Sequence, residues 1–251
     1  MTDARTLSYI NLYAIFGSIP ALCKYDAQAK KLANVKKISI GFSVKNGPCA
    51  TLTFDRGECT WSQGCDGCDI KIPFSSPEKF NAMIDGTGTP IPTKGFTKLG
   101  FLLKNFIGIT DILTKYLRAT EEDLKNKEFF EISTRLMFSV IAGAIAQIAN
   151  NDKVGKSSAS YITDGTVMLS MGECDFARID AKNHILSSKM EKPEKYTSYM
   201  IFESLELARA LFDGKVNAVA CVGKGQIRIG GMISQVDNVN RILDRVAMYL
   251  A

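Results

Sequence analysis

Cysteines are the residues of this chain whose spacing comes nearest to a chemical site. Cys65 and Cys68 form a C-x-x-C pair, Cys59 lies upstream, and Cys49 faces this region across a predicted hairpin. Four thiolates placed in this way could hold zinc or an iron–sulfur cluster. The second C-x-x-C pair of a typical zinc site is missing, and a strand rather than a helix follows this pair, which argues against redox chemistry. We expect no metal and no other cofactor, and we keep a cysteine-ligated metal protein as a third alternative.

Other motifs that enzymes use are incomplete. Gly155-Lys156-Ser157 imitates the end of a phosphate-binding loop, but Asn150 stands where the leading glycine should be. Gly223-Lys224-Gly225 lacks the third glycine of a dinucleotide fingerprint and precedes a predicted strand instead of a helix. His184 is the only histidine, and no nucleophile motif surrounds it. We therefore expect the chain not to be an enzyme.

Composition favours an ordinary globular protein. The 251 residues are 46% hydrophobic and 23% charged, and 31 basic against 26 acidic residues give a formal charge of +5. The one basic cluster, Lys30-Lys31 with Lys36-Lys37, has no interleaved aromatic residues, so we expect no nucleic-acid partner. Seven cysteines, an odd number without a secretory context, favour a reducing cytoplasm.

The apolar runs are predicted to be core helices. The longest, Leu136 to Ala149, spans about 14 residues, which is too short to cross a bilayer. The run from Leu7 to Cys23 has an internal twin in the second half of the chain, so a signal peptide is not expected there. We expect no transmembrane segment, although transient contact with a membrane surface stays open.

Two pairs of segments repeat at an offset of about 126 to 128 residues. Residues 12–30 align with 138–156, and residues 74–86 align with 202–214, where six of thirteen positions agree. Both pairs lie in the same order, which one chance similarity between helices would not produce. The sequence thus predicts two related units, residues 1–125 and 126–251.

Each unit is predicted to follow the same order of elements. An apolar helix comes first, then an antiparallel meander such as residues 38–44, 50–54 and 69–74, then a helix that ends at Asp-Gly. In the second unit, residues 216–222 and 226–229 are expected to form two more strands before a closing helix. In the first unit, residues 86–95 contain too much Gly, Pro and Thr for strands, so its sheet is predicted to be incomplete.

Residues 202–231, FESLELARALFDGKVNAVACVGKGQIRIGG, resemble the sterol carrier protein type 2 family. The resemblance lies in a helix, a Gly-Lys break at Gly214-Lys215, a glycine turn at Gly225, and an Ile-x-Ile-x-Gly strand. It extends less closely to residues 42–86. It implies an α+β fold with two such units, each a mostly antiparallel or mixed sheet of four to five strands covered by helices. It also implies a tunnel for fatty acyl chains, sterols or similar lipids.

The closing helices are the expected walls of such a tunnel. Their apolar faces are wider than one core contact requires, and lipid pockets are lined mainly by apolar side chains. The candidate lining residues are Phe96, Leu99, Leu102, Leu103 and Phe106 in the first unit, and Val236, Val239, Ile242, Leu243 and Val246 in the second. Ordinary core packing and contact between the two units remain the alternatives.

The resulting hypothesis is a cytoplasmic, non-catalytic protein that binds or transfers a hydrophobic small molecule or lipid. The alternative is an interaction or accessory module whose apolar helix faces bind another protein. The sequence leaves open the ligand, whether one or both units bind it, the oligomeric state and how the units pack.

Overall fold

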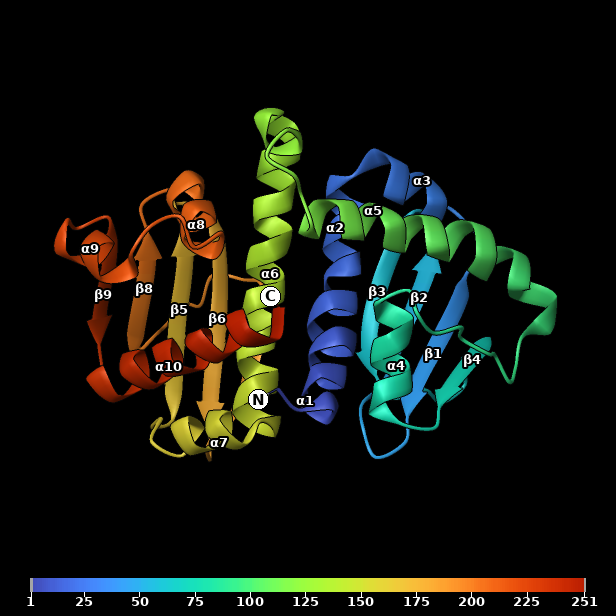
Figure 1. The fold of residues 1–251 in the computed structure, drawn as a ribbon, viewed down its shortest axis with the longest axis horizontal. Helices are drawn as coiled ribbons and strands as arrows, with labels where there is room; N and C mark the ends of the chain where they lie inside the picture. Colours follow the sequence, from blue (N-terminus) through green and yellow to red (C-terminus); the bar gives the residue numbers. More distant parts are fainter. Residues whose placement is uncertain (1, 251) are drawn as a thin grey trace. The chain divides into compact units, whose positions relative to one another are not determined.

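The computed structural model describes residues 2–250. The chain divides into two compact units, Met1–Leu136 and Met137–Ala251. The division falls inside the long helix α6 (Lys127–Asn151), whereas the repeat in the sequence places it after residue 125. Each unit contains one mixed sheet covered by helices, which confirms the predicted α+β class (Figure 1).

The first unit contains a helical segment, a four-stranded sheet and two later helices. Its elements are α1 (Ala4–Tyr9), a π-helical segment (Ile10–Ile15), a 3-10 turn (Phe16–Ser18), α2 (Ile19–Tyr25), α3 (Ala27–Ala33), β1 (Ile38–Val44), β2 (Cys49–Asp55), β3 (Glu58–Gln63), β4 (Ile70–Phe74), α4 (Pro77–Ile84), a 3-10 turn (Phe96–Lys98), a π-helical segment (Phe101–Phe106), α5 (Ile107–Leu117), and a 3-10 turn (Asp123–Lys125).

The first sheet has the strand order β3-β2-β1-β4. The first three strands form the predicted antiparallel meander, but β4 pairs parallel with β1, with Phe74 beside Val44. The predicted meander therefore does not include residues 69–74, whereas the mixed sheet of the predicted fold class is confirmed. Because Ile70, Ile72 and Phe74 are apolar, β4 is more stable beside the buried strand β1 than beside the exposed edge strand β3.

The second unit repeats this order and adds a strand. Its elements after the first part of α6 are α7 (Lys153–Ala159), β5 (Gly165–Met171), β6 (Asp175–Lys182), β7 (Ile185–Lys189), β8 (Ser198–Phe202), α8 (Leu205–Phe212), α9 (Ala218–Gly223), β9 (Ile227–Gly231), and α10 (Ile233–Leu250). The sheet order is β7-β6-β5-β8-β9. Strand β8 is parallel to β5, and β9 is antiparallel to β8.

The first unit has no counterpart of β9 among its described residues, as its Gly, Pro and Thr content predicts. Only a bridge between Lys71 and Lys94 occupies the outer edge of β4. Their backbones share a hydrogen bond of 3.2 Å, in which Lys71 N donates to the Lys94 carbonyl. The sheets of four and five strands agree with the predicted fold.

The structure corrects the secondary structure predicted for residues 216–222. This segment was expected to be a strand, but it contains helix α9. The Asn217 side chain accepts a hydrogen bond of 3.0 Å from the Ala220 N–H and so caps the helix. Two alanines follow this cap, and alanine is the best helix former. Gly225, at a φ of 76°, then turns the chain into β9, where the predicted strand is confirmed.

Local signals at the ends of α4 and α8 are confirmed. Ser76 and Ser204 cap these helices by accepting hydrogen bonds from Lys79 N–H and Leu207 N–H. Both helices end at Asp-Gly, and the two glycines, Gly86 and Gly214, have φ values of 71° and 67°. A side chain with a Cβ would be strained at these angles, which explains the glycines.

Two aspartates that the sequence repeat aligns with each other have the same structural role, each in its own unit. Asp26 caps α3 and accepts a hydrogen bond of 2.9 Å from the Tyr116 hydroxyl. Asp152 caps α7 and accepts one of 2.7 Å from the Tyr249 hydroxyl. Each tyrosine comes from the last turns of the closing helix of its unit, α5 or α10.

Two helical segments among the described residues are long and apolar enough to cross a membrane by length and composition alone. They are Ala4–Tyr25 and Lys127–Asn151, and 61% and 72% of their apolar windows are buried inside the fold. The helices exceed the 14-residue run on which the sequence argument rested. Because buried core helices pass the same test, this is weak evidence for membrane spans.

Candidate functional site: an apolar cavity in the second unit

A cavity of about 920 Å³ lies inside the second unit. Its walls come from α6, the sheet strands β8 and β9, helices α8 and α9, and helix α10. In Figure 1, α10 crosses in front of this sheet, and α9 lies at the β9 edge. Ligand pockets of proteins measure about 300–1,000 Å³, so the cavity is large enough for a small molecule.

The wall is mainly aliphatic and aromatic. Met200 and Phe202 contribute from β8, Leu211 and Phe212 from α8, and Ile227 from β9. Helices α6 and α10 add further aliphatic side chains, which are Met137, Ile141, Val236, Leu243, Val246 and Leu250. Such a surface offers dispersion contacts and few hydrogen bonds, so it suits a hydrophobic guest.

Phenylalanines fill the corresponding part of the first unit. The Phe16 ring lies 5.3 Å from Phe42, 5.7 Å from Phe106 and 6.3 Å from Phe80, measured between ring centroids. Phe54 lies 6.2 Å from Phe106 and extends the cluster. All five side chains are buried, with exposed fractions of 6% or less. The core of the first unit is therefore packed with interlocking aromatic rings.

Smaller residues stand at the equivalent positions of the second unit. In the aligned segments, Ala142 takes the place of Phe16, and Ala208 takes the place of Phe80. The strand registers place Leu169 where Phe42 stands, and Ala181 where Phe54 stands. Three of these four phenylalanines are thus replaced by alanine. None of these four residues lines the cavity itself, so the two units differ in how aromatic their packed cores are.

Asp152 fixes α10 beside the cavity. Its carboxylate accepts hydrogen bonds from Arg245 Nη2 at 2.8 Å and from the Tyr249 hydroxyl at 2.7 Å, both on α10. It also accepts 2.9 Å bonds from the Val154 and Gly155 N–H groups at the start of α7. Burial by itself would raise the pKa of Asp152, but the hydrogen bonds from Arg245, Gly155 and Tyr249 together lower it. The carboxylate is therefore charged at neutral pH and joins the two helices.

Gln235 fixes the other end of α10. Its side chain is fully buried, and its carbonyl accepts hydrogen bonds from the Thr197 hydroxyl at 2.7 Å and the Ser198 hydroxyl at 2.6 Å. Its amide donates to the Thr163 carbonyl at 3.0 Å. Each polar atom of this buried amide group thus has a partner, so the first turn of α10 is tied to β8.

The charged side chains in the cavity wall are all carboxylates, namely Asp213, Asp237 and Asp244. Arg209 contacts Asp213 at 2.9 Å, and Arg241 contacts Asp237 at 3.0 Å. These two carboxylates are neutralised by arginines that lie outside the wall. No lysine or arginine among the described residues lines the cavity itself.

The lining residues that the sequence predicts on the two closing helices lie in different environments in the two units. On α10, Val236, Leu243 and Val246 line the cavity, whereas Val239 and Ile242 are fully buried outside its wall. In the first unit, Leu102 and Phe106 lie in the core, Leu99 is partly buried against it, and Phe96 and Leu103 are 63% and 64% exposed. The structure therefore brings three of the second group together around a cavity and spreads the first group between core and surface.

Several residues of the cavity wall are not among the lining residues that the sequence predicts. Met200, Phe202 and Ile227 have the alternating pattern of strands, which says only that one face of the sheet is buried. Val219 and Val222 were assigned to a strand because α9 was not expected. No local pattern in the sequence separates these cavity-lining residues from ordinary core residues.

The cysteines form pairs in the first unit. Cys23 and Cys59 are hydrogen-bonded; this bond raises the pKa of Cys59, as does burial, and it lowers the pKa of Cys23. Burial and a hydrogen bond to Cys65 raise the pKa of Cys49 to about 12. Among residues 2–250, no group of three or more Cys, His, Asp or Glu side chains is placed to hold a metal ion. Cys68 therefore belongs to no such group.

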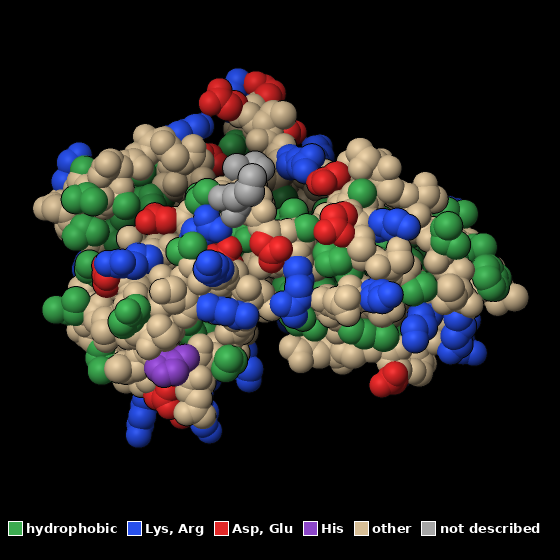
Figure 2. Space-filling view, turned by 60° about the horizontal axis from the view of Figure 1, so that its bottom comes forward, with side chains coloured by type: hydrophobic (Ala, Val, Ile, Leu, Met, Phe, Trp, Pro, Cys, Tyr) green, Lys and Arg blue, Asp and Glu red, His purple; other side chains and the backbone are tan. Residues whose placement is uncertain are grey.

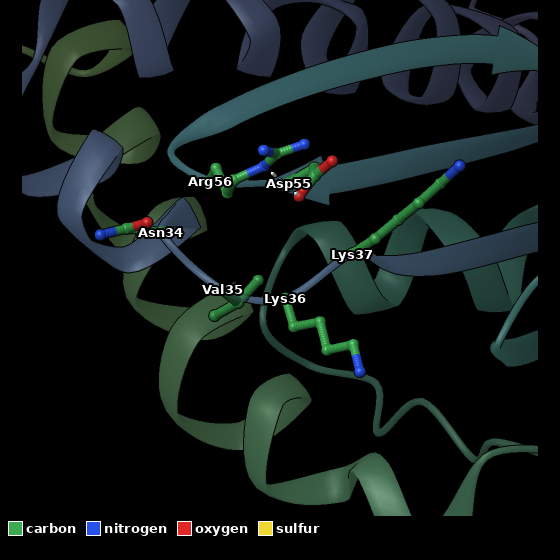
Figure 3. Close-up of a pocket in the computed structure, with 6 residues that line it drawn as sticks. All are labelled: Asn34, Val35, Lys36, Lys37, Asp55 and Arg56. Carbon is green, nitrogen blue, oxygen red and sulfur yellow. Dashed lines mark hydrogen bonds and ion pairs between the residues drawn. The ribbon is translucent and has the colours of Figure 1, made fainter.

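The first unit also has an open surface depression of about 490 Å³. Figure 3 shows its six residues, Asn34, Val35, Lys36, Lys37, Asp55 and Arg56, on the loop after α3 and at the turn after β2. Its ion pair joins Arg56 and Asp55 at 3.3 Å, and the Arg56 side chain is 85% exposed. Water screens such a pair, so this depression has no buried polar group that could fix a ligand.

Comparisons with known proteins give structural neighbours only. No family model and no curated protein matches the chain. Among solved structures, a protein described as "UbiJ-SCP2 Ubiquinone synthesis protein" has 15% identity and a TM-score of 0.35, and the match covers 45% of this chain and 93% of that protein. Sterol carrier protein domain 2 of Helicoverpa armigera has 16% identity and a TM-score of 0.36, with 46% and 89% coverage. Sterol carrier protein 2 of Yarrowia lipolytica, in its apo form, has 19% identity and a TM-score of 0.33, with 42% and 88% coverage.

The structural neighbours named above are sterol carrier protein 2 domains, and each match covers less than half of the chain. Such a domain is shorter than this chain, so a match of this kind does not describe both units at once.

Proposed function

We propose that this chain binds a long hydrophobic molecule in the cavity of its second unit and carries it without covalent chemistry. The observation that carries the proposal is the 920 Å³ apolar cavity between α10 and the sheet of that unit, which is open to solvent on one side. The first unit, whose aromatic core is closely packed, takes a supporting role. The proposal rests on the cavity and not on the names of the structural neighbours.

An empty cavity of this kind has a free-energy cost that a guest can remove. Apolar wall atoms that face this space gain dispersion contacts and lose contact with water when a guest binds. Each buried methylene contributes about 0.8 kcal/mol, so ten of them contribute about 8 kcal/mol. This corresponds to a Kd of about 1 µM. The apolar wall therefore supports binding without a dedicated polar anchor.

The head group of the guest is expected to be uncharged. The wall presents Asp213, Asp237 and Asp244 and no cationic group among the described residues. A carboxylate head would be repelled by Asp244, for which the structure shows no ion-pair partner within the described chain, and it would find no donor of positive charge. A hydroxyl head can hydrogen-bond to these carboxylates or to Asn240.

The experiment is a pair of calorimetric titrations with ligands of equal chain length, hexadecanol and palmitate. We expect saturable binding of hexadecanol at one site per chain, and binding of palmitate at least about tenfold weaker because of charge repulsion. A chain that binds neither ligand contradicts the proposed function. Equal affinities, or tighter binding of palmitate, contradict only the preference for an uncharged head.

A further inference from the structure

Exposed apolar side chains surround one side of the cavity. They lie on α9, on the edge strand β9, at the start of α10 and in the short segments before α9 and α10. In Figure 2, hydrophobic side chains come to the surface at the left of the view, in the second unit. The exposed fractions are 38% for Val216, 80% for Val219, 37% for Val222, 44% for Ile229, 41% for Met232 and 84% for Ile233. We call these six residues the apolar rim. So many adjacent exposed aliphatic side chains are unusual on a surface that faces only water.

The apolar rim is continuous with the cavity. Val219, Val222, Ile229 and Ile233 are at once exposed to solvent and part of the cavity wall. The cavity therefore reaches the surface through this rim. A hydrophobic guest that reached this opening through water would first have to expose its apolar surface to the water. The free-energy cost of that exposure scales with the apolar area exposed.

Basic residues flank the segment of the chain that carries the rim. The segment from Gly214 to Ile233 contains Lys215, Lys224 and Arg228 and no Asp or Glu. Two of the three carboxylates in the adjoining cavity wall, Asp213 and Asp237, are already paired with arginines. Lys215 and Lys224 are exposed, and Arg228 is exposed on the opposite face of β9 from Ile227 and Ile229. Aliphatic side chains beside basic ones are the combination that binds the interface of a membrane with anionic lipids.

The structure also holds the rim in place. The Asn217 side chain caps α9, and the buried Cys221 anchors it, since the Gln226 N–H donates a 2.9 Å hydrogen bond to the Cys221 carbonyl. Strand β9 is paired to β8 over its whole length. Four of the six rim side chains therefore belong to helices or a paired strand, and Val216 and Met232 lie in the short segments directly beside them.

We propose that the apolar rim docks on the surface of an anionic lipid bilayer, so that the guest passes between bilayer and cavity without crossing water. This inference rests on the proposed function. Charge complementarity and continuity with the cavity favour a bilayer over a protein partner.

Vesicle flotation of the full chain tests the docking surface. We expect binding to vesicles of phosphatidylcholine with phosphatidylglycerol, and much weaker binding to phosphatidylcholine alone. Replacing Lys215 and Lys224 by glutamine should weaken binding to the anionic vesicles about 25-fold, because each basic residue near an anionic surface contributes about one factor of five.

A matched pair of double variants distinguishes a specific effect of the rim from the general effect of adding negative charge to the surface. Val216→Glu with Met232→Glu changes two rim residues that lie outside the cavity wall. Ile185→Glu with Met190→Glu changes two exposed residues, 61% and 45%, at the opposite edge of the same sheet. The first variant should lose vesicle binding and keep hexadecanol binding, and the control should keep both.

The outcomes are distinguishable. Unchanged vesicle binding by the Val216→Glu, Met232→Glu variant overturns the docking surface. So does hexadecanol binding without any vesicle binding, a result that leaves the proposed function standing. A self-association that this variant abolishes, without an effect on vesicles, shows that a second copy covers the rim and also overturns the inference. Absence of hexadecanol binding rejects the proposed function itself.

Discussion

Replacing Val246 by Trp is expected to weaken hexadecanol binding about 50-fold without lowering the thermal unfolding midpoint. Val246 lies on α10, is 3% exposed and forms part of the cavity wall. An indole there would occupy space that the guest needs. Displacing about three methylenes costs about 2.4 kcal/mol at about 0.8 kcal/mol each, which is about 50-fold in Kd. The measurement is calorimetric titration together with thermal unfolding.

The effect on stability separates a cavity from a packed core. In a packed core, an oversized side chain costs about 1–3 kcal/mol, whereas in an empty cavity it gains contacts. Val154→Trp is the matched control, because Val154 is 50% exposed on α7 and lies outside the cavity wall. If Val246→Trp fails to fold, Val236→Trp tests the same wall. A folded Val246→Trp protein with native affinity would contradict a guest at this position.

Replacing Asp152 by Ala is expected to lower the free energy of unfolding by about 3–5 kcal/mol, because it leaves a largely buried arginine without its partner. The Arg245 and Asp152 side chains are 13% and 4% exposed, and their atoms lie 2.8 Å apart. The change also removes the cap of α7. Urea unfolding at neutral pH measures the loss.

A second ion pair on α10 provides the control for Asp152. Arg241 and Asp237 are 65% and 53% exposed, at 3.0 Å. Asp237→Ala should cost less than about 0.5 kcal/mol, since water screens this pair. Equal losses for Asp152→Ala and Asp237→Ala would contradict the role given to burial.

Acid should remove the contribution of Asp152. Its pKa is lowered in the folded protein, so the stabilisation is complete above the unfolded value of about 3.9. It is lost as the pH falls through the lowered folded pKa. The difference in stability between the native protein and Asp152→Ala should therefore shrink below about pH 4.

Most of the fold could be predicted from the sequence because its signals are local. The serine caps at Ser76 and Ser204 and the glycine stops at Gly86 and Gly214 depend on a few neighbouring residues. The difference between four and five strands followed from the Gly, Pro and Thr content of residues 86–95. These features are decided by backbone geometry within one or two turns.

Features that depend on distant partners were missed. The place of β4 beside β1 is decided by which strand can bury Ile70 and Ile72, and the six residues between β3 and β4 do not show this. Helix α9 was missed because its valines also suit a strand, and the Asn217 cap is a weak signal against them.

The candidate site was predicted only in part for a related reason. A closing helix can be recognised as apolar, but a cavity beside it depends on the volume of every side chain opposite. Leu102 and Phe106 pack into the aromatic core of the first unit, whereas Val236 and Val246 line the cavity of the second. The exposure of Phe96 in a 3-10 turn and of Leu103 in a π-helical segment likewise follows from backbone geometry that no spacing rule indicates.

A crystal structure of the protein with a terminally brominated long-chain alcohol tests most directly whether the second unit encloses a guest. We predict an anomalous bromine signal inside the space bounded by Met200, Ile227 and Val246. Side chains that have collapsed into this space, with bromine found only on the outer surface or nowhere, would show that the chain carries no ligand there.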